Sequence, residues 1–456
     1  MTNINFEDVQ GLVFSGYNKV MKYSSYYLLK IDDPGKVRTW LKTLADEKRI
    51  TNGTHRGTKW CLNLAFSFSG FEKMKLANDS FEQAFREGMD SGRRSTVLGD
   101  QGDNHPDKWL WGHAGKSVDM LLMLFSKDEA IHEERKGAEE SAFMTGGISL
   151  IERLDAVRPV DAGDFIKEHF GFADGISDPV VEGFPKADEK SASPNPQAPK
   201  MIPAGEFLLG YPNGYDGKIT AIPNAGSLGD KFGFNGTYLV FRQLQQDVKG
   251  FWTFINNEAA AQGIDPEYLA AKFVGRWKNG AVVSPGEDSA PGTVSNEFDF
   301  RDDPDGRGCP FGSHIRRANP RGQGLGETID DSLTVANRHR LLRRGRSYGN
   351  FLDNPLDDGG NQNRGLFFIC LNANIERQFE FVQHTWINSI KFDGLYDEDD
   401  PLIGSYGSGN QGFTRSFTLQ DEPLRRRICN FQQYVALRGG GYFFLPGLNA
   451  LRMLGE

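Results

Sequence analysis

Residues 309–321 read CPFGSHIRRANPR and form the most distinctive stretch of the sequence. His314 is followed within this stretch by three arginines, of which Arg321 lies seven residues after the histidine. Arginine binds carboxylate or phosphate groups through a planar, bidentate pair of donors. A lone histidine is ordinarily a packed or capping residue. Here it becomes a candidate ligand, because a cofactor with carboxylic acid groups would need arginines beside it.

The arginines continue on both sides of this stretch. Residues 301–346 contain ten arginines, no lysine and six acidic residues, inside a chain whose formal net charge is −9. Two simpler explanations stay open from the residues alone: a solvated basic face, or arginines that pair with acidic loops of the same chain. A nucleic-acid interface is disfavoured, because aromatic side chains on which bases could stack are scarce in this segment.

Two further segments contain chemically capable residues. Residues 169–179 read HFGFADGISDP, so that Asp174 lies between glycines and aromatic residues. Residues 341–349 read LLRRGRSYG and place Arg343 and Arg344 next to each other. An Asp-Gly pair by itself predicts only a turn. The density of charged and aromatic residues in these segments nevertheless indicates a site.

The composition is that of a globular chain with a large core: 456 residues, of which 38% are hydrophobic and 25% charged. The acidic balance, 52 Lys and Arg against 61 Asp and Glu, disfavours a protein that binds nucleic acid or an anionic membrane with its whole surface. The longest apolar run, residues 120–125, is far shorter than the ~20 residues of a membrane-spanning helix.

The N-terminal residues and the cysteines bear on the compartment. The chain begins MTNINFEDVQ, with acidic residues where a secretory signal has basic ones. Its four cysteines, Cys61, Cys309, Cys370 and Cys429, are dispersed and form no CxxC pair. Reduced thiols fit this pattern best. We therefore expect a cytoplasmic protein with no signal peptide and no transmembrane segment.

Strand-like and helix-like segments alternate along the chain, which predicts an α+β fold. In the first part, the expected strands are residues 26–31, 62–69 and 118–125, and the expected helices are residues 36–44 and 126–141. A proline-rich polar stretch at residues 187–203 predicts a linker. In the second part, the expected strands are residues 237–242 and 366–372, and the expected helices are residues 266–274 and 375–386.

The segments GFADGISDP, CPFGSHIRRANPR and LLRRGRSYG, in that order, resemble the signature segments of the dye-decolourising peroxidases (DyP-type), a family of haem enzymes. Supporting stretches are GEFLLGYPN (205–213), NGTYLVFRQ (235–243), KFVGRWKNG (272–280) and IERQFEFVQHTW (375–386). The resemblance covers most of the chain and is clearest from about residue 165 to the C-terminus. In length and N-terminal sequence the chain resembles the longer, non-exported members.

The resemblance implies an α+β fold of two ferredoxin-like halves, each an antiparallel sheet with helices around it, in a dimeric α/β barrel-like arrangement. Residues 1–200 would form the N-terminal half, which contains the GFADG segment on the distal side of the haem. Residues 201–456 would form the C-terminal half, which contains the haem-binding site.

On the proximal side of the haem, the resemblance makes His314 the axial ligand of the iron. A carboxylate that matches Asp400 would orient the second ring nitrogen and raise the basicity of the ligand. The acidic residues 397–399 precede Asp400 directly and remain alternatives. Arg321 resembles the family arginine that pairs with a haem propionate.

On the distal side, the resemblance places Asp174 and Arg343, with the neighbouring Arg344 as the main rival. Asp174 would move a proton between the oxygens of hydrogen peroxide, while Arg343 supplies a fixed positive charge. Because a carboxylate has a lower pKa than histidine, activity is expected to favour acidic conditions. Leu366 and Phe368 lie two apart on one face of a predicted strand and would line this pocket.

The implied function is a peroxidase with haem b (iron protoporphyrin IX) that uses hydrogen peroxide to oxidise bulky dyes and phenolic or other aromatic donors by one-electron steps. Tyr348 and Trp386 match positions of oxidisable aromatics and are candidate electron relays at the surface. The expected partners are hydrogen peroxide and aromatic electron donors, with neither nucleic acid nor membrane, and the chain is expected to be a monomer or a homodimer.

Two other classes of function remain. A haem-binding or haem-handling protein without a physiological peroxidase cycle would keep His314 and Arg321 but would not need both Asp174 and Arg343. The joint presence of the latter two favours the enzyme. A structural α+β protein, whose arginines only balance acidic loops, would bind no haem at all.

Overall fold

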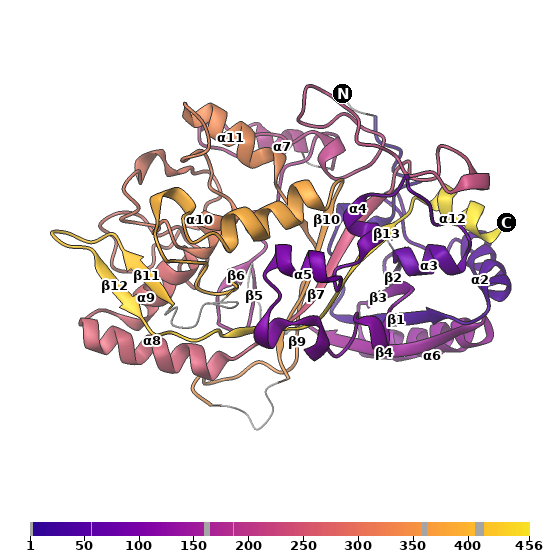
Figure 1. Ribbon diagram of the computed structural model, residues 1–456, viewed down its shortest axis with the longest axis horizontal. Coiled ribbons are helices and arrows are strands. Elements are labelled where there is room, and N and C mark those ends of the chain that lie inside the picture. The colour runs from indigo at the N-terminus through magenta and orange to yellow at the C-terminus, as the bar shows by residue number, and fades with distance from the viewer. Residues whose placement is uncertain (1–2, 56, 159–164, 186, 358–362, 406–414) are drawn as a thin grey trace.

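A single antiparallel sheet is the framework of the protein (Figure 1). The computed structural model describes residues 3–55, 57–158, 165–185, 187–357, 363–405 and 415–456. Within these residues, nine strands pair in the order β4-β1-β3-β2-β13-β7-β10-β8, with β9 also paired to β10. They are β1 (Tyr23–Ile31), β2 (Trp60–Phe66), β3 (Met120–Ser126), β4 (Ile148–Val157), β7 (Thr237–Gln246), β8 (Leu342–Arg343), β9 (Arg346–Tyr348), β10 (Gly365–Asn372) and β13 (Val435–Leu445).

The strand order repeats between the two halves of the chain. In the first half, β1 to β4 pair in the order fourth, first, third, second. In the second half, β13, β7, β10 and the short β8 and β9 follow the same order. With helices in the connections, each half is a ferredoxin-like unit, and the predicted fold class is confirmed. The boundary expected at residue 200 stays a prediction.

The remaining elements are shorter strands and helices. Two small hairpins are β5 (Ile166–Lys167) with β6 (Ala173–Asp174), and β11 (Ser416–Leu419) with β12 (Arg426–Cys429). The α-helices are α1 (Gly11–Phe14), α2 (Pro34–Asp46), α3 (Phe68–Lys73), α4 (Gln83–Glu87), α5 (Gly92–Leu98), α6 (Glu129–Thr145), α7 (Ala187–Ser191), α8 (Val248–Gln262), α9 (Pro266–Val274), α10 (His314–Ala318), α11 (Ile329–Arg338) and α12 (Leu448–Gly455). Two consecutive π-helical segments are η7 (Glu376–Glu380) and η8 (Val382–Ile387).

The sheet has two covered faces, as the alternation of side chains along β10 shows. Phe367, Ile369 and Leu371 point into an inner core that includes residues from β1, β2, β3, β7 and β13. Phe368 and Cys370 point to the opposite, outer face. Because the terminal strands β4 and β9 also lie against each other, the sheet curves into a barrel around the inner core.

Helices cover the outer face of the first half. Helix α2 starts at Pro34 and is capped by the Asp33 side chain, which accepts hydrogen bonds from the amides of Gly35 and Lys36. The helix buries Val37, Trp40 and Leu41 against the sheet. The predicted helix at residues 36–44 lies within it. Figure 1 shows α2, α6 and α12 together at the indigo-to-magenta end of the molecule. This part of the outer face is a packed apolar layer.

Three predicted segments differ in part from the structure. The strand expected over residues 62–69 ends at Phe66, because the Ser67 hydroxyl accepts a hydrogen bond from the Gly70 amide and starts α3. The predicted linker at residues 187–203 begins with the short helix α7. Residues 375–386 are helical as expected, but with the wider π geometry.

In the second half, the connections between strands are much longer. Residues 247–341 join β7 to β8 and contain α8, α9, α10 and α11. Residues 373–434 join β10 to β13 and contain η7, η8, β11 and β12. In Figure 1, α8, α9, α10, β11 and β12 lie at the end of the molecule away from α2 and α6. They place His314 and Arg321 beside the outer face of β7, β10 and β13.

Candidate active site

A large cavity, the His314 cavity, lies between the outer face of the second-half sheet and these long connections. It contains about 1600 Å³ of space free of protein atoms, part of it open to solvent. Leu244, Leu366 and Val435 of the sheet line one part, and helical residues such as Ile315 and Val382 line another. Four of its polar lining residues belong to the predicted site: His314, Asp174, Arg343 and Arg321.

His314 is the first residue of α10, and its side chain is fixed by Asp400. The Nδ1 of His314 lies 2.8 Å from Oδ2 of Asp400, while Oδ1 of Asp400 accepts from the amides of Leu402 and Ile403, both at 2.9 Å. His314 Nε2 makes no hydrogen bond with a described residue, and the 29% of the side chain that is exposed faces the cavity. Nε2 is therefore the nitrogen available to a ligand.

The pKa values of this pair are coupled. Burial acts to lower the pKa of His314, but the charge and hydrogen bond of Asp400 raise it above its ordinary value. Burial acts to raise the pKa of Asp400, but His314 and the backbone amides hold it below its ordinary value. Asp400 is therefore a carboxylate that accepts a hydrogen bond from the Nδ1–H group of His314. This hydrogen bond leaves Nε2 as the nitrogen whose lone pair faces the cavity.

The structure distinguishes Asp400 from the acidic residues before it. Asp399 pairs with the buried Arg415 at 3.3 Å, and Glu398 accepts from the backbone amide of Thr418 at 2.9 Å. Only Asp400, among the described contacts of residues 397–400, reaches the His314 ring. The sequence alone left these acids as alternatives.

Asp174 and Arg343 meet in the same cavity. Nη1 of Arg343, on β8, donates to Oδ1 of Asp174, on β6, at 2.8 Å, and the Gly175 amide donates to the same oxygen at 2.6 Å. Burial acts to raise the pKa of Asp174, but Arg343 outweighs it and holds this pKa below its ordinary value. Asp174 in turn raises the pKa of Arg343. The pair is an ionised carboxylate beside a permanent cation.

Arg344 points elsewhere, although it is adjacent in sequence. Its Nε donates to the Leu12 carbonyl at 2.9 Å and its Nη2 to the Val13 carbonyl at 2.7 Å. The strand alternation therefore directs Arg343 to the cavity and Arg344 to the first half of the chain.

Three arginines surround Ser177 at another part of the cavity wall: Arg276 and Arg321 are buried, and Arg340 is partly buried. Arg321 donates to the Ser177 hydroxyl at 3.2 Å, Arg276 to the same hydroxyl at 3.5 Å, and Arg340 to the Ser177 carbonyl at 2.6 Å. Within the described part of the chain, none of them has an acidic side chain within 4.0 Å, the limit for a salt bridge. Burial lowers the pKa of Arg276 and of Arg340 to about 10 each, and that of Arg321 well below its ordinary value.

This cluster indicates an anionic ligand, since buried cations without an acidic partner are unfavourable unless an anion compensates them. Sequence reasoning identified Arg321 but missed Arg276 and Arg340. The signal was present for Arg340, which belongs to the run of arginines without lysine at residues 301–346. Arg276 lies outside that run, so only the fold connects it with the other two.

The remaining candidates have different positions. Leu366 and Phe368 both line the cavity. Tyr348 is only 4% exposed and stacks on Phe367 in the inner core, with ring centroids 4.3 Å apart. Trp386 is 3% exposed and packs in a small apolar cluster beside η8. The expectation that these two aromatics lie at the surface is wrong, because their rings fill apolar layers.

The donors present fit a haem. The described residues contain no group of three or more His, Cys, Asp or Glu side chains that could hold a metal ion, so a metal at His314 must bring most of its ligands with it. A porphyrin does this, its iron takes a neutral imidazole, and its two propionates match the unpaired cations around Arg321. The apolar walls suit the rest of the macrocycle.

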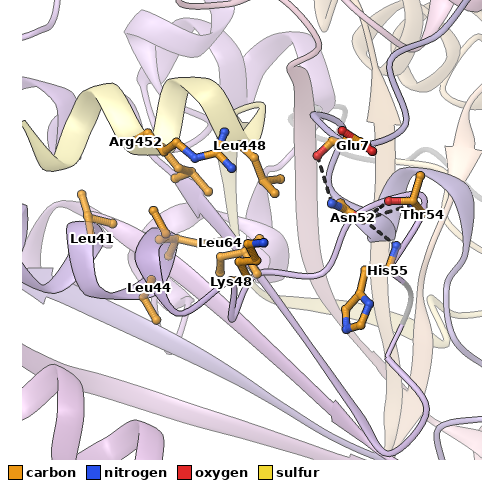
Figure 2. A pocket seen from close by; sticks show the side chains of 13 residues that line it. Glu7, Leu41, Leu44, Lys48, Asn52, Thr54, His55, Leu64, Leu448 and Arg452 are labelled. Atoms are coloured by element: carbon orange, nitrogen blue, oxygen red, sulfur yellow. Dashed lines mark hydrogen bonds between the residues drawn. The ribbon is translucent and has the colours of Figure 1, made fainter.

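A second cavity lies over the sheet of the first half, between α2, the C-terminal helix α12 and the loop at residues 52–55 (Figure 2). Its floor consists of apolar side chains, among them Leu41, Leu44 and Leu64. Its polar rim includes Lys48 and Arg452. No described hydrogen bond or ion pair joins an acid and a base among its lining residues, in contrast to the His314 cavity.

Comparisons with known proteins agree with this geometry. A family model described as the DyP dimeric alpha+beta barrel domain matches residues 8–159. The dye-decolorizing peroxidase msp1 of Mycetinis scorodonius is 30% identical over 98% of this chain and 87% of its own length. The chain belongs to the dye-decolourising peroxidase family. Its two ferredoxin-like halves are the barrel fold of that family.

Solved dye-decolourising peroxidases have the same fold over the whole chain. A DyP-type peroxidase from Anabaena sp. is 26% identical, with a TM-score of 0.81 over 98% of this chain and 94% of the other. A dye-decolorizing peroxidase in complex with 2,6-dimethoxyphenol is 26% identical, with a TM-score of 0.80 over 100% of both chains. As for membrane segments, none of the described helices has the length and apolarity needed to cross a bilayer.

Proposed function

We propose that this dye-decolourising peroxidase binds haem b in the His314 cavity and uses hydrogen peroxide to oxidise bulky dyes and phenolic or other aromatic donors by one-electron steps. The observation that supports this best is that one cavity is lined both by His314, whose ring Asp400 holds through Nδ1, and by the Asp174–Arg343 ion pair. They lie close enough for the charges of Asp174 and Arg343 to influence the pKa of His314.

Residues of the proximal group would hold the cofactor. His314 Nε2 would ligate the iron, and Asp400 would keep its Nδ1 protonated and its ring oriented. Arg321, with Arg276 and Arg340, would bind the propionates. When bound, the haem supplies an iron centre that hydrogen peroxide oxidises and that then takes single electrons from donors.

Asp174 and Arg343 would act on the peroxide. Oδ1 of Asp174 is occupied by Arg343 and Gly175, whereas Oδ2 makes no hydrogen bond with a described residue. Oδ2 is therefore the atom that would take a proton from one peroxide oxygen and return it to the other. The guanidinium of Arg343 would stabilise the negative charge that develops on the departing oxygen.

Bulky donors would react at a distance from the cavity. The relative bound to 2,6-dimethoxyphenol supports phenolic donors for this chain as well. Tyr348 and Trp386 would act as interior relay positions, since both are buried. Burial raises the pKa of Tyr348 to about 12, so that its oxidation would require a proton acceptor nearby.

An absorption spectrum tests this function. The purified protein should show a ferric haem Soret band that changes rapidly with one equivalent of hydrogen peroxide, and His314→Ala should lose or grossly alter that band. A Soret band that peroxide leaves unchanged would instead support a haem-handling protein. Absence of any haem after expression with adequate iron would contradict both functions and leave only the fold.

A further inference from the structure

A second carboxylate, Glu168, lines the His314 cavity next to Asp174. It follows β5 directly, and it lies at the start of the loop that joins β5 to β6. Its Oε2 accepts from the Phe170 amide and its Oε1 from the Phe172 amide, both at 2.9 Å. The side chain thus folds back over its own loop.

Glu168 closes the tip of the β5–β6 hairpin. The backbone supplies two more bonds there, from the Glu168 amide to the Phe172 carbonyl at 3.0 Å and from the Gly171 amide to the Glu168 carbonyl at 2.9 Å. Gly171 has φ +97°, which a residue with a side chain rarely adopts. Phe170 and Phe172 are 3% and 4% exposed, so their amides would lack an acceptor without this carboxylate.

The same carboxylate connects the hairpin to the second half of the molecule. Nε2 of Gln246, the last residue of β7, donates to Oε2 of Glu168 at 2.6 Å. Around it, the Trp252 indole donates to the Phe170 carbonyl at 3.1 Å, and the Ala173 amide donates to the Lys278 carbonyl at 3.1 Å. The hairpin is therefore held to the second half by one hydrogen bond to a carboxylate, that of Glu168, and by two hydrogen bonds to backbone carbonyls.

Asp174 is the last residue of this hairpin, two residues after Phe172, and it pairs with Ile166 across it. Its position relative to Arg343 depends on the hairpin, because Asp174 and Arg343 come from strands that do not pair with each other. We propose that Glu168 is a positioning residue, which holds the hairpin tip so that the Asp174 carboxylate meets Arg343. This role rests on the proposed peroxidase function of the cavity.

Two substitutions distinguish the effect of the length of the Glu168 side chain from the effect of its charge. Glu168→Gln keeps the length, but its NH₂ group must face either the Phe170 or the Phe172 amide, so that one bond is lost in either orientation. Glu168→Asp keeps the charge but is too short to reach both amides. Asp178→Asn is the matched control, because it removes a charge near Arg343 without touching the tip amides.

The first readout is hydrogen–deuterium exchange of residues 166–176 in the haem-free protein, which needs no activity. Each Glu168 variant should exchange at least one of the Phe170 and Phe172 amides roughly 10- to 100-fold faster, as expected for losing a hydrogen bond to a charged acceptor. The Gly175 amide, which donates to Asp174, should also exchange faster. Asp178→Asn should leave all three within roughly threefold of the wild type.

The second readout is the reaction of the haem-loaded protein with hydrogen peroxide, followed in the Soret band. Both Glu168 variants should retain their haem but react roughly 10- to 100-fold more slowly. In Glu168→Asp, which keeps the negative charge near Asp174, the pH at which half of the rate is lost on acidification should move upward, since a displaced Asp174 loses the contact with Arg343 that lowers its pKa. A merely structural residue would not move this midpoint.

The outcomes are distinct. Unchanged exchange in both variants would overturn the proposal, and so would faster exchange with an unchanged peroxide rate and pH midpoint. Recovery of wild-type behaviour by Glu168→Asp would also overturn it in favour of a purely electrostatic role. If the wild type bound haem but did not react with peroxide, the proposed function would fail instead, while exchange in the haem-free protein would still report on the hairpin.

Discussion

The two halves of the molecule have the same strand order but different connections. In the first half, residues 32–59 join the first two strands and residues 127–147 join the last two, each with one long helix, α2 or α6. In the second half, the corresponding connections are residues 247–341 and 373–434. The first pair covers the sheet with an apolar layer, whereas the second pair encloses the His314 cavity.

The cavities of the two halves differ in the same way. The cavity between α2 and α12 has an apolar floor and a polar rim, in which the described residues form no acid–base pair (Figure 2). In the other cavity, His314 belongs to the first long connection and Asp400 to the second. The common fold therefore supplies a stable scaffold, and the long connections of one copy supply His314 and Asp400.

The largest expected effect comes from the Asp174–Arg343 pair, which lines the His314 cavity and has no described counterpart in the cavity between α2 and α12. Asp174→Asn and Arg343→Ala should each slow the reaction with hydrogen peroxide by about 10²- to 10³-fold, because one removes the proton carrier and the other the fixed positive charge. Stopped-flow absorbance of the Soret band measures this rate. Haem content should stay that of the wild type, and a rate within threefold of it in both variants would contradict the assignment.

A smaller effect is expected at the residue that joins the two long connections. Asp400→Asn should weaken haem retention or slow the peroxide reaction by about 10- to 100-fold, as for other second-layer ligands of metal-bound histidines. Asparagine can still accept the Nδ1 proton but has no charge to raise the basicity of the ring. Haem transfer to apomyoglobin measures retention. Wild-type values of both retention and rate would contradict the role of Asp400 in orienting His314.

The pH dependence provides a further test of Asp174. Because Arg343 holds its pKa below the ordinary value, the peroxide rate should persist on acidification to a pH below that value, which is about 3.9, and should fall only when Asp174 is protonated. In Arg343→Ala the residual rate should be lost at a higher pH, since burial alone raises this pKa. Identical midpoints in the two proteins would show that another group limits the rate.

The smallest effect is expected in the cavity of the first half. Lys48→Ala and Arg452→Ala should leave haem content and peroxide rate unchanged. Each should alter the free energy of unfolding by no more than about 0.5 kcal/mol. The reason is that both side chains are exposed and take part in no ion pair that the structure describes. Denaturant unfolding and the Soret assay together measure this. A tenfold loss of activity in either variant would show that the two halves are functionally coupled.

Much of the fold could be predicted from the sequence, because buried strands such as β3 and β10 are continuous apolar runs. Strand β13 was missed, since its three glycines, residues 439–441, weaken the strand signal. The structure gives a reason for one of them: a Cβ on Gly439 would lie 2.5 Å from Nε1 of Trp111. Such a close approach depends on distant parts of the chain and leaves no local pattern.

For the site, the sequence by itself determined which residue types occur together: a histidine among arginines, an aspartate between glycines, and a row of acids at residues 397–400. Only the tertiary structure decided which members meet. His314 and Asp400 are 86 residues apart, and Asp174 and Arg343 are 169 apart. The choice of Asp400, and of Arg343 over its neighbour, follows from which side of a strand or loop faces the cavity. Direction in space is a property of the folded backbone, whereas the sequence specifies only the order of the side chains.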